Sequence, residues 1–205
     1  MSDTPSDAPA LFRADRLGLS LAGQTVLSDL SFAILPGLTL VRGGDGRGKT
    51  SLLRLIAGTL QPSTGALHRP AGTVFFETPS DPAHDPLVAR DWLQALRARA
   101  PRWRAGVLTP LVEAFGLAEH LDKPMHMLST GSRRKVGLVA AAASGAALTL
   151  LDMPYAALDA RSCRVLTQLL AEAADGRDAA WVIADHTLPA GLAEVAWAGV
   201  VDLGD

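Results

Sequence analysis

The sequence predicts an α/β fold with a parallel sheet at its core, an antiparallel β edge and an inserted helical subdomain. Short apolar runs that suit buried strands alternate with segments whose apolar residues recur at helical spacing, as where 148–151 is followed by 161–174. Such alternation is typical of a parallel sheet whose strands are joined by right-handed crossovers. A helix-only block at about 87–121 interrupts the alternation, and it predicts an inserted subdomain at about residues 78–135.

Each predicted element has its own local signal. Alternating apolar and polar residues at 30–34 indicate a strand, and the segment from residue 11 onward predicts two or three strands that turn at 22–24. Further strands are expected at 38–41, 73–76, 148–151, 181–184 and 200–201. Helices are expected at 49–60, 130–143 and 161–174, and the helical block is expected to break at Pro101 and Pro110.

Composition limits the class of protein. The chain has 205 residues, of which 48% are hydrophobic and 20% charged, as in a soluble globular domain. A net charge of -2 gives no reason to expect nucleic acid as a partner. The uncharged run at 136–151 is shorter than the ~20 residues of a membrane span. Residues 1–10 suit a disordered polar tail rather than a signal peptide, so we expect one folded domain at 11–205.

A glycine-rich loop lies between the strand predicted at 38–41 and the helix predicted at 49–60. It matches the pattern G-x-x-x-x-G-K-[ST], whose glycines let successive backbone N–H groups point at phosphate oxygens. Lys49 is expected to reach the β- and γ-phosphates, and the Thr50 hydroxyl is expected to ligate Mg²⁺. We therefore predict a site for ATP or GTP made by Gly43, Gly44, Asp45, Gly46, Arg47, Gly48, Lys49, Thr50 and Ser51.

A carboxylate ends one of the predicted buried strands. Asp152 follows the apolar run at 148–151. In P-loop proteins an aspartate at such a strand end holds Mg²⁺ beside the loop's Ser or Thr. An apolar run with an aspartate is weak evidence by itself, but after the glycine-rich loop it predicts a Mg²⁺ site and a P-loop NTPase-type core.

Three further segments resemble the ATP-binding cassette (ABC) family, and the resemblance covers nearly the whole chain from residue 11. Leu-Ser-Thr-Gly-Ser-Arg-Arg-Lys-Val at 128–136 resembles the ABC signature, whose usual form is Leu-Ser-Gly-Gly-Gln followed by basic residues. Ala-Leu-Asp at 157–159 resembles the D-loop, and His186 resembles the switch histidine. The resemblance implies a head-to-tail dimer of cassettes, homo- or heteromeric, with each nucleotide between one subunit's P-loop and the other's signature.

The signature supplies a second candidate anion site. Ser129 and the N–H of Gly131 lie at or near a predicted helix N-terminus, where backbone donors favour anions. Taken alone, this segment is equally an ordinary Ser cap on a helix. One such site cannot surround a triphosphate, but two facing surfaces can, so ATP is expected to join two subunits.

His186 is the predicted catalytic histidine. A lone histidine at a strand end is more often a structural residue. Its position in the motif order favours contact with the γ-phosphate and the attacking water.

Two departures from the family affect hydrolysis. The family normally has glutamate after the strand-end aspartate, where this chain has Met153, and a thioether cannot act as a general base. Loss of a positioned base typically costs ~10²–10⁴-fold in rate. Glu77 stands where the family usually has the Q-loop glutamine, and it is predicted to ligate Mg²⁺ and to replace the base in part, a solvated glutamate being the alternative. Asp185 is a second candidate base.

A third departure concerns recognition of the nucleotide base. The aromatic residue that commonly stacks on adenine is missing, and by spacing its place falls near Leu21. Base–aromatic stacking is worth ~1–3 kcal/mol in nucleic-acid systems, so modest affinity and loose base selectivity are expected. Asp45 places a carboxylate close to the phosphates; Arg47 offsets it, or Asp45 is only a charged loop tip.

The resemblance implies the ATP-binding subunit of an ABC transporter. A separate transmembrane permease is expected as its partner, docked on the helical block, with the subunit in the cytoplasm on the inner face of the cell membrane. The single cysteine, Cys163, fits a reducing cytoplasm. The short length and the signature pattern resemble most the cassette subunit of the haem exporter in cytochrome c maturation. The alternative, motivated by Met153, is a binding-only cassette that uses ATP as a structural or regulatory ligand.

Overall fold

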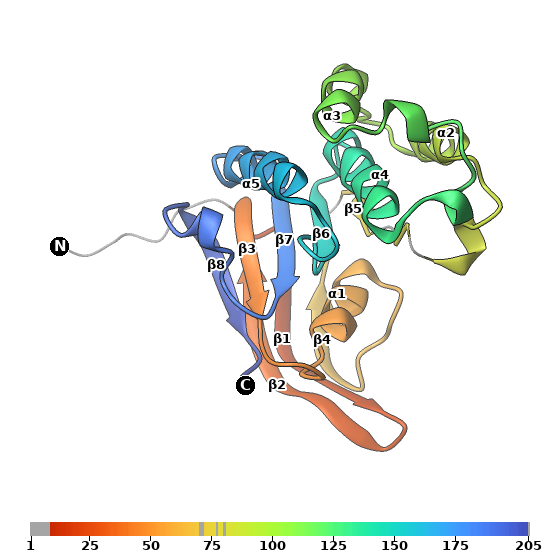
Figure 1. Cartoon of the computed structure of the whole chain (residues 1–205). Coiled ribbons are helices and arrows are strands. Elements are labelled where there is room, and N and C mark those ends of the chain that lie inside the picture. Colours follow the sequence, from red (N-terminus) through yellow and green to blue (C-terminus); the bar gives the residue numbers. More distant parts are fainter. Residues whose placement is uncertain (1–8, 70–71, 77, 80, 205) are drawn as a thin grey trace.

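The computed structural model describes residues 9–69, 72–76, 78–79 and 81–204. At its centre is a parallel sheet (Figure 1), whose strands in spatial order are β5 (Val74–Phe75), β6 (Leu148–Asp152), β7 (Ala180–Asp185), β3 (Gly37–Arg42) and β8 (Trp197–Asp202). The strands β3, β6 and β7 are buried over most of their length, which explains their continuous apolar sequences. The predicted α/β fold with a parallel core is confirmed.

The antiparallel strands form a second sheet of their own. In it, β1 (Phe12–Leu21) lies between β2 (Gln24–Ile34) and β4 (Thr64–His68) and pairs antiparallel with both. β4 was not among the predicted strands, because its sequence Thr-Gly-Ala-Leu-His is mostly exposed and has almost no apolar pattern. Pairing with β1, rather than local propensity, makes this segment a strand.

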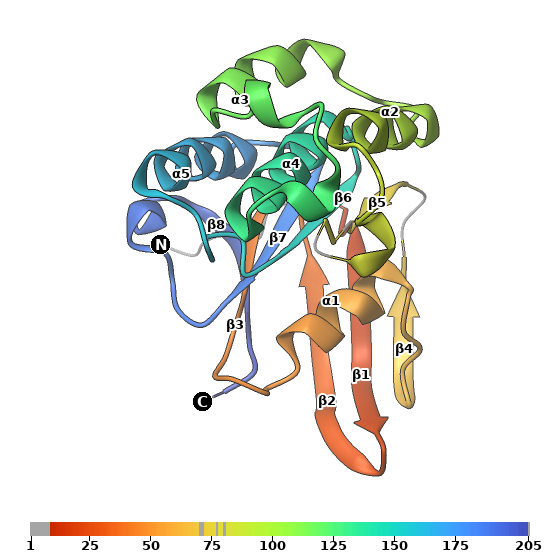
Figure 2. The ribbon, with the colours of Figure 1, turned by 45° about the vertical axis from the view of Figure 1, so that its right-hand side comes forward.

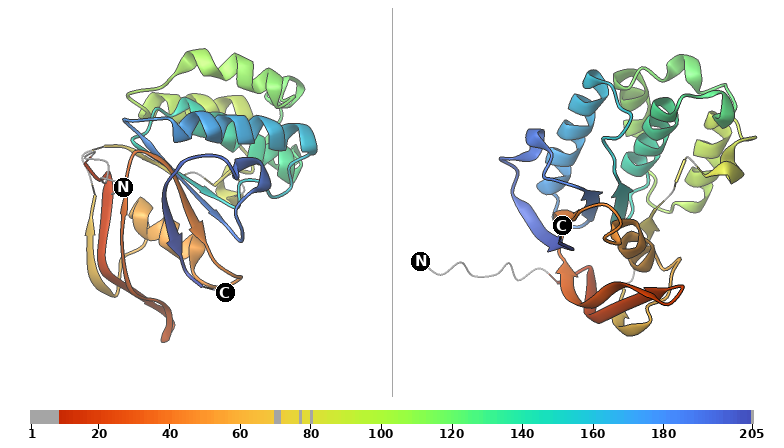
Figure 3. Two further views of the ribbon diagram at one scale, coloured as in Figure 1. Left: turned by 90° about the vertical axis from the view of Figure 1, so that its left-hand side faces the viewer. Right: turned by 60° about the horizontal axis from the view of Figure 1, so that its bottom comes forward.

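Helix α1 (Lys49–Ala57) lies between the two sheets (Figure 3). Its apolar side chains Leu52, Leu53, Leu55 and Ile56 are fully buried in a cluster with residues of both sheets. Gly58, in the left-handed conformation with φ of 81°, ends the helix before the predicted end at residue 60. Because α1 is held on two sides, its N-terminus has a fixed position relative to the parallel sheet.

The other helices cover the opposite face of the parallel sheet in two layers (Figure 2). The inner layer consists of α4 (Thr130–Ala143) and α5 (Ala160–Ala174), and the outer one of α2 (Ala89–Arg99) and α3 (Leu108–Ala114), which both contact α4. Short 3₁₀ turns precede, connect or follow these helices along the chain: η1 (Pro82–His84), η2 (Ala105–Val107), η3 (Ala118–His120), η4 (Met125–Met127) and η5 (Ala190–Leu192).

One of the two predicted breaks in the helical block is wrong. α2 ends at Arg99, so the break at Pro101 is confirmed. Pro110 instead lies in the first turn of α3, where proline is tolerated because the missing N–H has no helical partner. Within the described part of the chain, none of the helices has the length and apolar character needed to cross a membrane.

Candidate nucleotide site

Three adjacent strands end at one edge of the parallel sheet and bring the predicted site residues together. In the register of the sheet, the last residue of β3 lies beside Asp185 of β7, and Asp152 of β6 lies beside Ala184. The glycine-rich loop at 43–48 follows β3 directly, and His186 follows β7. Open α/β sheets form their ligand sites at this carboxyl edge.

The glycine-rich loop turns directly into α1. Gly46 and Gly48 have φ of 74° and 88°, a left-handed region that glycine adopts without strain. A Cβ at Gly48 would lie 2.8 Å from Cγ1 of Val26, so a side chain does not fit there. No side chain of the described residues caps the start of α1, so its first backbone N–H groups are available to an anion.

Lys49 lies buried beneath the loop, with an exposed fraction of 8%. Its ammonium group donates to the carbonyl oxygens of Gly43, at 2.6 Å, and Gly44, at 2.8 Å. A third contact joins Nζ to Nδ1 of His186 at 3.4 Å. A buried charge is costly unless it is hydrogen-bonded, and these three contacts match the three protons of the ammonium group. The positive charge is therefore held at the floor of the loop.

Thr50 and Asp152 meet although they are far apart in the sequence. The Thr50 hydroxyl donates to Oδ2 of Asp152 at 2.6 Å. The other carboxylate oxygen, Oδ1, is buried and has no hydrogen-bond partner, which is unfavourable without a further ligand. Hydroxyl and carboxylate oxygens are the ligands that Mg²⁺ prefers. The pair therefore fits the predicted metal site.

These groups face an open pocket of about 410 Å³, named here the nucleotide pocket. By sequence spacing, Leu21 stands near the place of the aromatic residue that stacks on adenine in the family. Leu21 is not part of the lining of the nucleotide pocket, whereas Val26 of β2 is. The lining residues are Val26, Asp45, Gly46, Arg47, Gly48, Lys49, Thr50, Ser51, Asp152, Met153 and His186.

The imidazole of His186 lies between two charged groups of the loop. Its Nδ1 contacts Lys49, and its Nε2 lies 3.5 Å from Oδ1 of Asp45. Asp185, the second candidate base, accepts a hydrogen bond from the backbone N–H of His186 at 2.7 Å. The Asp185 carboxylate is therefore engaged by the backbone directly after β7. Glu77, predicted as a metal ligand and substitute base, lies outside the described residues.

Met153 lines the nucleotide pocket and has a strained backbone. Its φ is 47°, which is uncommon for a residue other than glycine. Nη1 of Arg134 donates to the carbonyl oxygens of Asp152, at 3.0 Å, and Met153, at 2.6 Å, and the N–H of Met153 donates to Ala184. Burial lowers the pKa of Arg134 from its usual value. The sequence marked Arg134 only as a basic residue of the signature and gave no sign of this contact.

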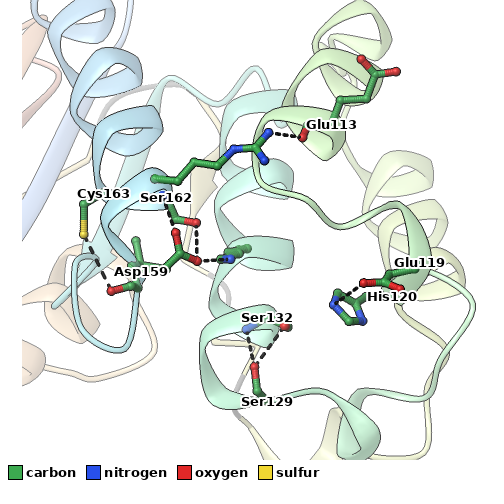
Figure 4. A network of polar contacts seen from close by, with 11 residues as sticks. Glu113, Glu119, His120, Ser129, Ser132, Asp159, Ser162 and Cys163 are labelled. Carbon is green, nitrogen blue, oxygen red and sulfur yellow. Dashed lines mark hydrogen bonds and ion pairs between the residues drawn. The ribbon is translucent and has the colours of Figure 1, made fainter.

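The two predicted signature residues lie at the start of α4, outside the lining of the nucleotide pocket. Ser129 caps the helix: its hydroxyl oxygen accepts from the N–H of Ser132 at 3.1 Å and contacts the Ser132 hydroxyl at 3.0 Å (Figure 4). A Cβ at Gly131 would collide with the carbonyl oxygen of Ala157, so the signature helix packs closely on the predicted D-loop. Within one chain the two candidate anion sites therefore remain separate.

An ion pair joins the signature helix to the helix that follows the predicted D-loop (Figure 4). Asp159 accepts from Nζ of Lys135 at 2.6 Å and caps α5 by accepting from the N–H of Ser162 at 2.8 Å. The hydrogen bond from Lys135, followed by those from Ser162, holds the pKa of the Asp159 carboxyl well below its usual range. The segments that resemble the signature and the D-loop are thus fastened together.

The fold and the site define a class of protein. A glycine-rich loop between β3 and α1, with a buried lysine and a Thr–Asp pair at the carboxyl edge of a parallel sheet, is the arrangement of a P-loop nucleotide-binding protein. The family model described as ABC transporter matches residues 27–156. The chain therefore belongs to the ABC transporter family, whose members hydrolyse ATP, and it is an ATP-binding subunit of that family.

Curated relatives carry two kinds of name. The cytochrome c biogenesis ATP-binding export protein CcmA of Pseudomonas savastanoi pv. phaseolicola is 32% identical and the alignment covers 92% of this chain and 95% of that protein. The CcmA of Rhodospirillum rubrum is 36% identical, over 89% of this chain and 84% of the relative. The zinc import ATP-binding protein ZnuC of Halorhodospira halophila is 31% identical, and the alignment covers 87% of this chain and 68% of that protein.

Solved structures support the fold. A putative ABC transporter ATP-binding protein from Pyrococcus furiosus superposes with a TM-score of 0.74 at 21% identity, covering 94% of this chain and 96% of the other. An ATP-binding subunit of an ABC transporter superposes with a TM-score of 0.71 at 23% identity, over 87% of this chain and 80% of the other.

Proposed function

We propose that the chain binds Mg-ATP in the nucleotide pocket and hydrolyses it to power transport. The observation that carries this proposal is the 2.6 Å contact between Thr50 and Asp152, because it places an oxygen pair suited to Mg²⁺ beside the phosphate loop. The loop's N–H groups hold the triphosphate, and Lys49 turns from the Gly43 and Gly44 carbonyls to the β- and γ-phosphates. When bound, Mg²⁺ supplies neutralisation of the phosphate charge.

The purine base of the nucleotide is held by contact with aliphatic side chains rather than by stacking on an aromatic ring. Val26 and Met153 are the apolar side chains among the described lining residues, which include no Phe, Tyr or Trp. Stacking of a base on an aromatic ring is worth ~1–3 kcal/mol by analogy with nucleic-acid systems. Affinity is accordingly modest, and ATP and GTP are distinguished weakly.

Two copies act as a head-to-tail dimer, or this chain pairs with a second kind of cassette. Ser129 is exposed and Gly131 lies in the first turn of α4, where backbone N–H groups favour an anion. Since neither residue lines the nucleotide pocket of its own chain, the signature is free to close over the nucleotide of a partner.

His186 contacts the γ-phosphate and the attacking water. Glu77 remains proposed as a further Mg²⁺ ligand and as the substitute for the missing general base. The specific observation that favours a binding-only cassette is Met153, which lines the pocket where the family has its catalytic carboxylate. Membership of a family of ATPases favours turnover. The steady-state rate of ATP turnover decides between these two functions.

The permease is a separate polypeptide that docks on the helical block, and the subunit lies on the cytoplasmic, inner face of the cell membrane. Two large apolar side chains are exposed there, Leu87 at 40% and Met127 at 64%. They lie on paired segments, because the N–H of Met125 donates to the carbonyl of Leu87 at 2.8 Å. An apolar permease helix would cover both.

The transporter is of the haem-exporter type. The chain covers 95% of the length of one relative named as a cytochrome c biogenesis export protein, against 68% of one named as a zinc importer. The relative of the first kind from Rhodospirillum rubrum is 36% identical, against 31% for the zinc importer, and this difference favours the first kind of system. A permease reading frame beside this one, of the cytochrome c biogenesis kind, would support this assignment, and a metal-importer permease would contradict it.

The variant Asp152→Ala is expected to remove the Mg²⁺ dependence of nucleotide binding. Turnover should fall on the order of 100-fold or more, because charge neutralisation by a bound metal is worth several kcal/mol in phosphoryl transfer. Calorimetric titration with ATP in the presence of Mg²⁺ or of a chelator measures the first effect, and a steady-state ATPase assay measures the second. Asp175→Ala, an exposed aspartate at the end of α5, is the matched control. A response to Mg²⁺ that survives Asp152→Ala would contradict the assigned site.

A further inference from the structure

A continuous row of polar groups crosses the nucleotide pocket from the loop tip to its floor. The carboxylate of Asp45 lies 3.5 Å from Nε2 of His186, and Nδ1 of the same ring lies 3.4 Å from the ammonium of Lys49. All three residues line the nucleotide pocket. Each ring nitrogen thus has a charged side chain of the loop as its neighbour.

The partners of the ring determine its tautomer. An ammonium group is only a donor, so a hydrogen bond between these two groups has Nδ1 as its acceptor. A neutral ring then carries its proton on Nε2, the nitrogen that faces the acceptor Asp45. A carboxylate that binds one ring N–H fixes the tautomer and leaves the other nitrogen as a base.

The other carboxylates at this edge are engaged elsewhere. Asp152 accepts from Thr50, and Asp185 accepts from the backbone N–H of His186. At the position where the family has a glutamate, Met153 offers no base. Among the described residues, Asp45 is the carboxylate whose side chain contacts the imidazole.

We propose that Asp45 is a positioning residue for ATP hydrolysis, which holds His186 with its proton on Nε2 so that Nδ1 can accept a proton from water. This inference rests on the proposed function. When Lys49 turns to the phosphates, it releases Nδ1. A water O–H bond then breaks, its proton passes to Nδ1, its oxygen bonds to the γ-phosphorus, and the bond from that phosphorus to the β-phosphate oxygen breaks to release ADP.

The solvent exposure of Asp45 and His186 determines how much activity the loss of Asp45 should cost. The Asp45 side chain is 96% exposed and that of His186 is 41% exposed, so water screens their attraction. Replacing a carboxylate that orients a histidine typically costs 10–100-fold in activity at metal sites. We therefore expect a loss of about tenfold here, the lower end of that range.

Kinetics of three full-length variants test the role of Asp45. Asp45→Ala should lower kcat about tenfold, while ATP binding stays unchanged or tightens because a like charge near the phosphates is removed. Asp45→Asn keeps an acceptor oxygen and should retain more activity than Asp45→Ala. Asp122→Ala removes an exposed carboxylate that pairs with Arg90 outside the pocket, and it should leave kcat at the wild-type value.

The tautomer is read directly from the ring nitrogens. Nitrogen-15 NMR of histidine-labelled protein, assigned by comparison with His186→Gln, should show Nε2 protonated in the wild type and a mixture of tautomers in Asp45→Ala. Unchanged kcat together with an unchanged tautomer in Asp45→Ala would overturn the role of Asp45 alone. If the wild type neither binds nor hydrolyses Mg-ATP, the proposed function fails, and the inference fails with it.

Discussion

Replacing Met153 by glutamate is expected to raise the ATPase kcat by roughly 10²–10⁴-fold, because it restores a positioned general base. The backbone at this position is held independently of the side chain. Arg134 donates to the Met153 carbonyl at 2.6 Å, and the Met153 N–H donates to the carbonyl of Ala184 at 2.9 Å. Glutamate and methionine have similar lengths, so the new carboxylate should enter the nucleotide pocket from the same backbone.

Met153→Gln is the matched control for this change. It adds polarity and hydrogen-bonding capacity at the same length but no base, so its kcat should remain near that of the wild type. A steady-state phosphate-release assay compares the three proteins. An equal gain in both variants would show that polarity, rather than a base, limits the reaction.

The wild-type rate in the same assay separates the two proposed functions. A silent wild type that Met153→Glu activates would favour the binding-only cassette. Brisk wild-type turnover that is lost in Glu77→Gln would identify Glu77 as the substitute base. If turnover survives in Glu77→Gln and falls in Asp45→Ala, the base is His186 positioned by Asp45.

Substitution of Lys49 by alanine is expected to abolish measurable binding of Mg-ATP, a loss on the order of 100-fold or more. The ammonium is the buried positive charge of the loop, and charge-assisted hydrogen bonds to phosphate are about twice as strong as neutral ones. The change also leaves the carbonyls of Gly43 and Gly44 without their donor. Each unpaired buried acceptor costs about 1–3 kcal/mol, so a lower Tm is expected as well.

Lys49→Gln separates loss of charge from loss of stability. Its N–H₂ group is an uncharged donor one bond closer to the backbone, so Tm should fall less than in Lys49→Ala while ATP binding is still lost. Calorimetric titration and thermal unfolding of the three proteins provide both readouts. Wild-type affinity in either variant would overturn the assigned phosphate cradle.

The parallel core could be predicted because its elements depend on local sequence. The strands β3, β6 and β7 are buried on both faces, and α1 and α5 have apolar residues at helical spacing. β4 was missed because pairing with β1, rather than its own sequence, makes it a strand. Pro110 was misread because its effect depends on whether it stands in the first turn of a helix or beyond it.

In the candidate site, too, some residues could be predicted from the sequence and some contacts could not. The glycine-rich loop and Asp152 could be found because their chemistry requires particular residues at a strand end. The contacts from Arg134 to the Met153 backbone and from Asp45 to His186 join segments far apart in the chain, and one sequence contains no signal for them. Ser129 and Gly131 lie outside the nucleotide pocket of their own chain, so their proposed role depends on a second cassette.

The most direct test is a crystal structure of the full chain with Mg²⁺ and a non-hydrolysable ATP analogue. We expect the triphosphate to lie along residues 43–50, with Nζ of Lys49 on the β- and γ-phosphate oxygens and the metal ion on the oxygens of Thr50 and Asp152. An analogue bound elsewhere, or a Lys49 ammonium that stays on the Gly43 and Gly44 carbonyls beside a bound nucleotide, would contradict this arrangement.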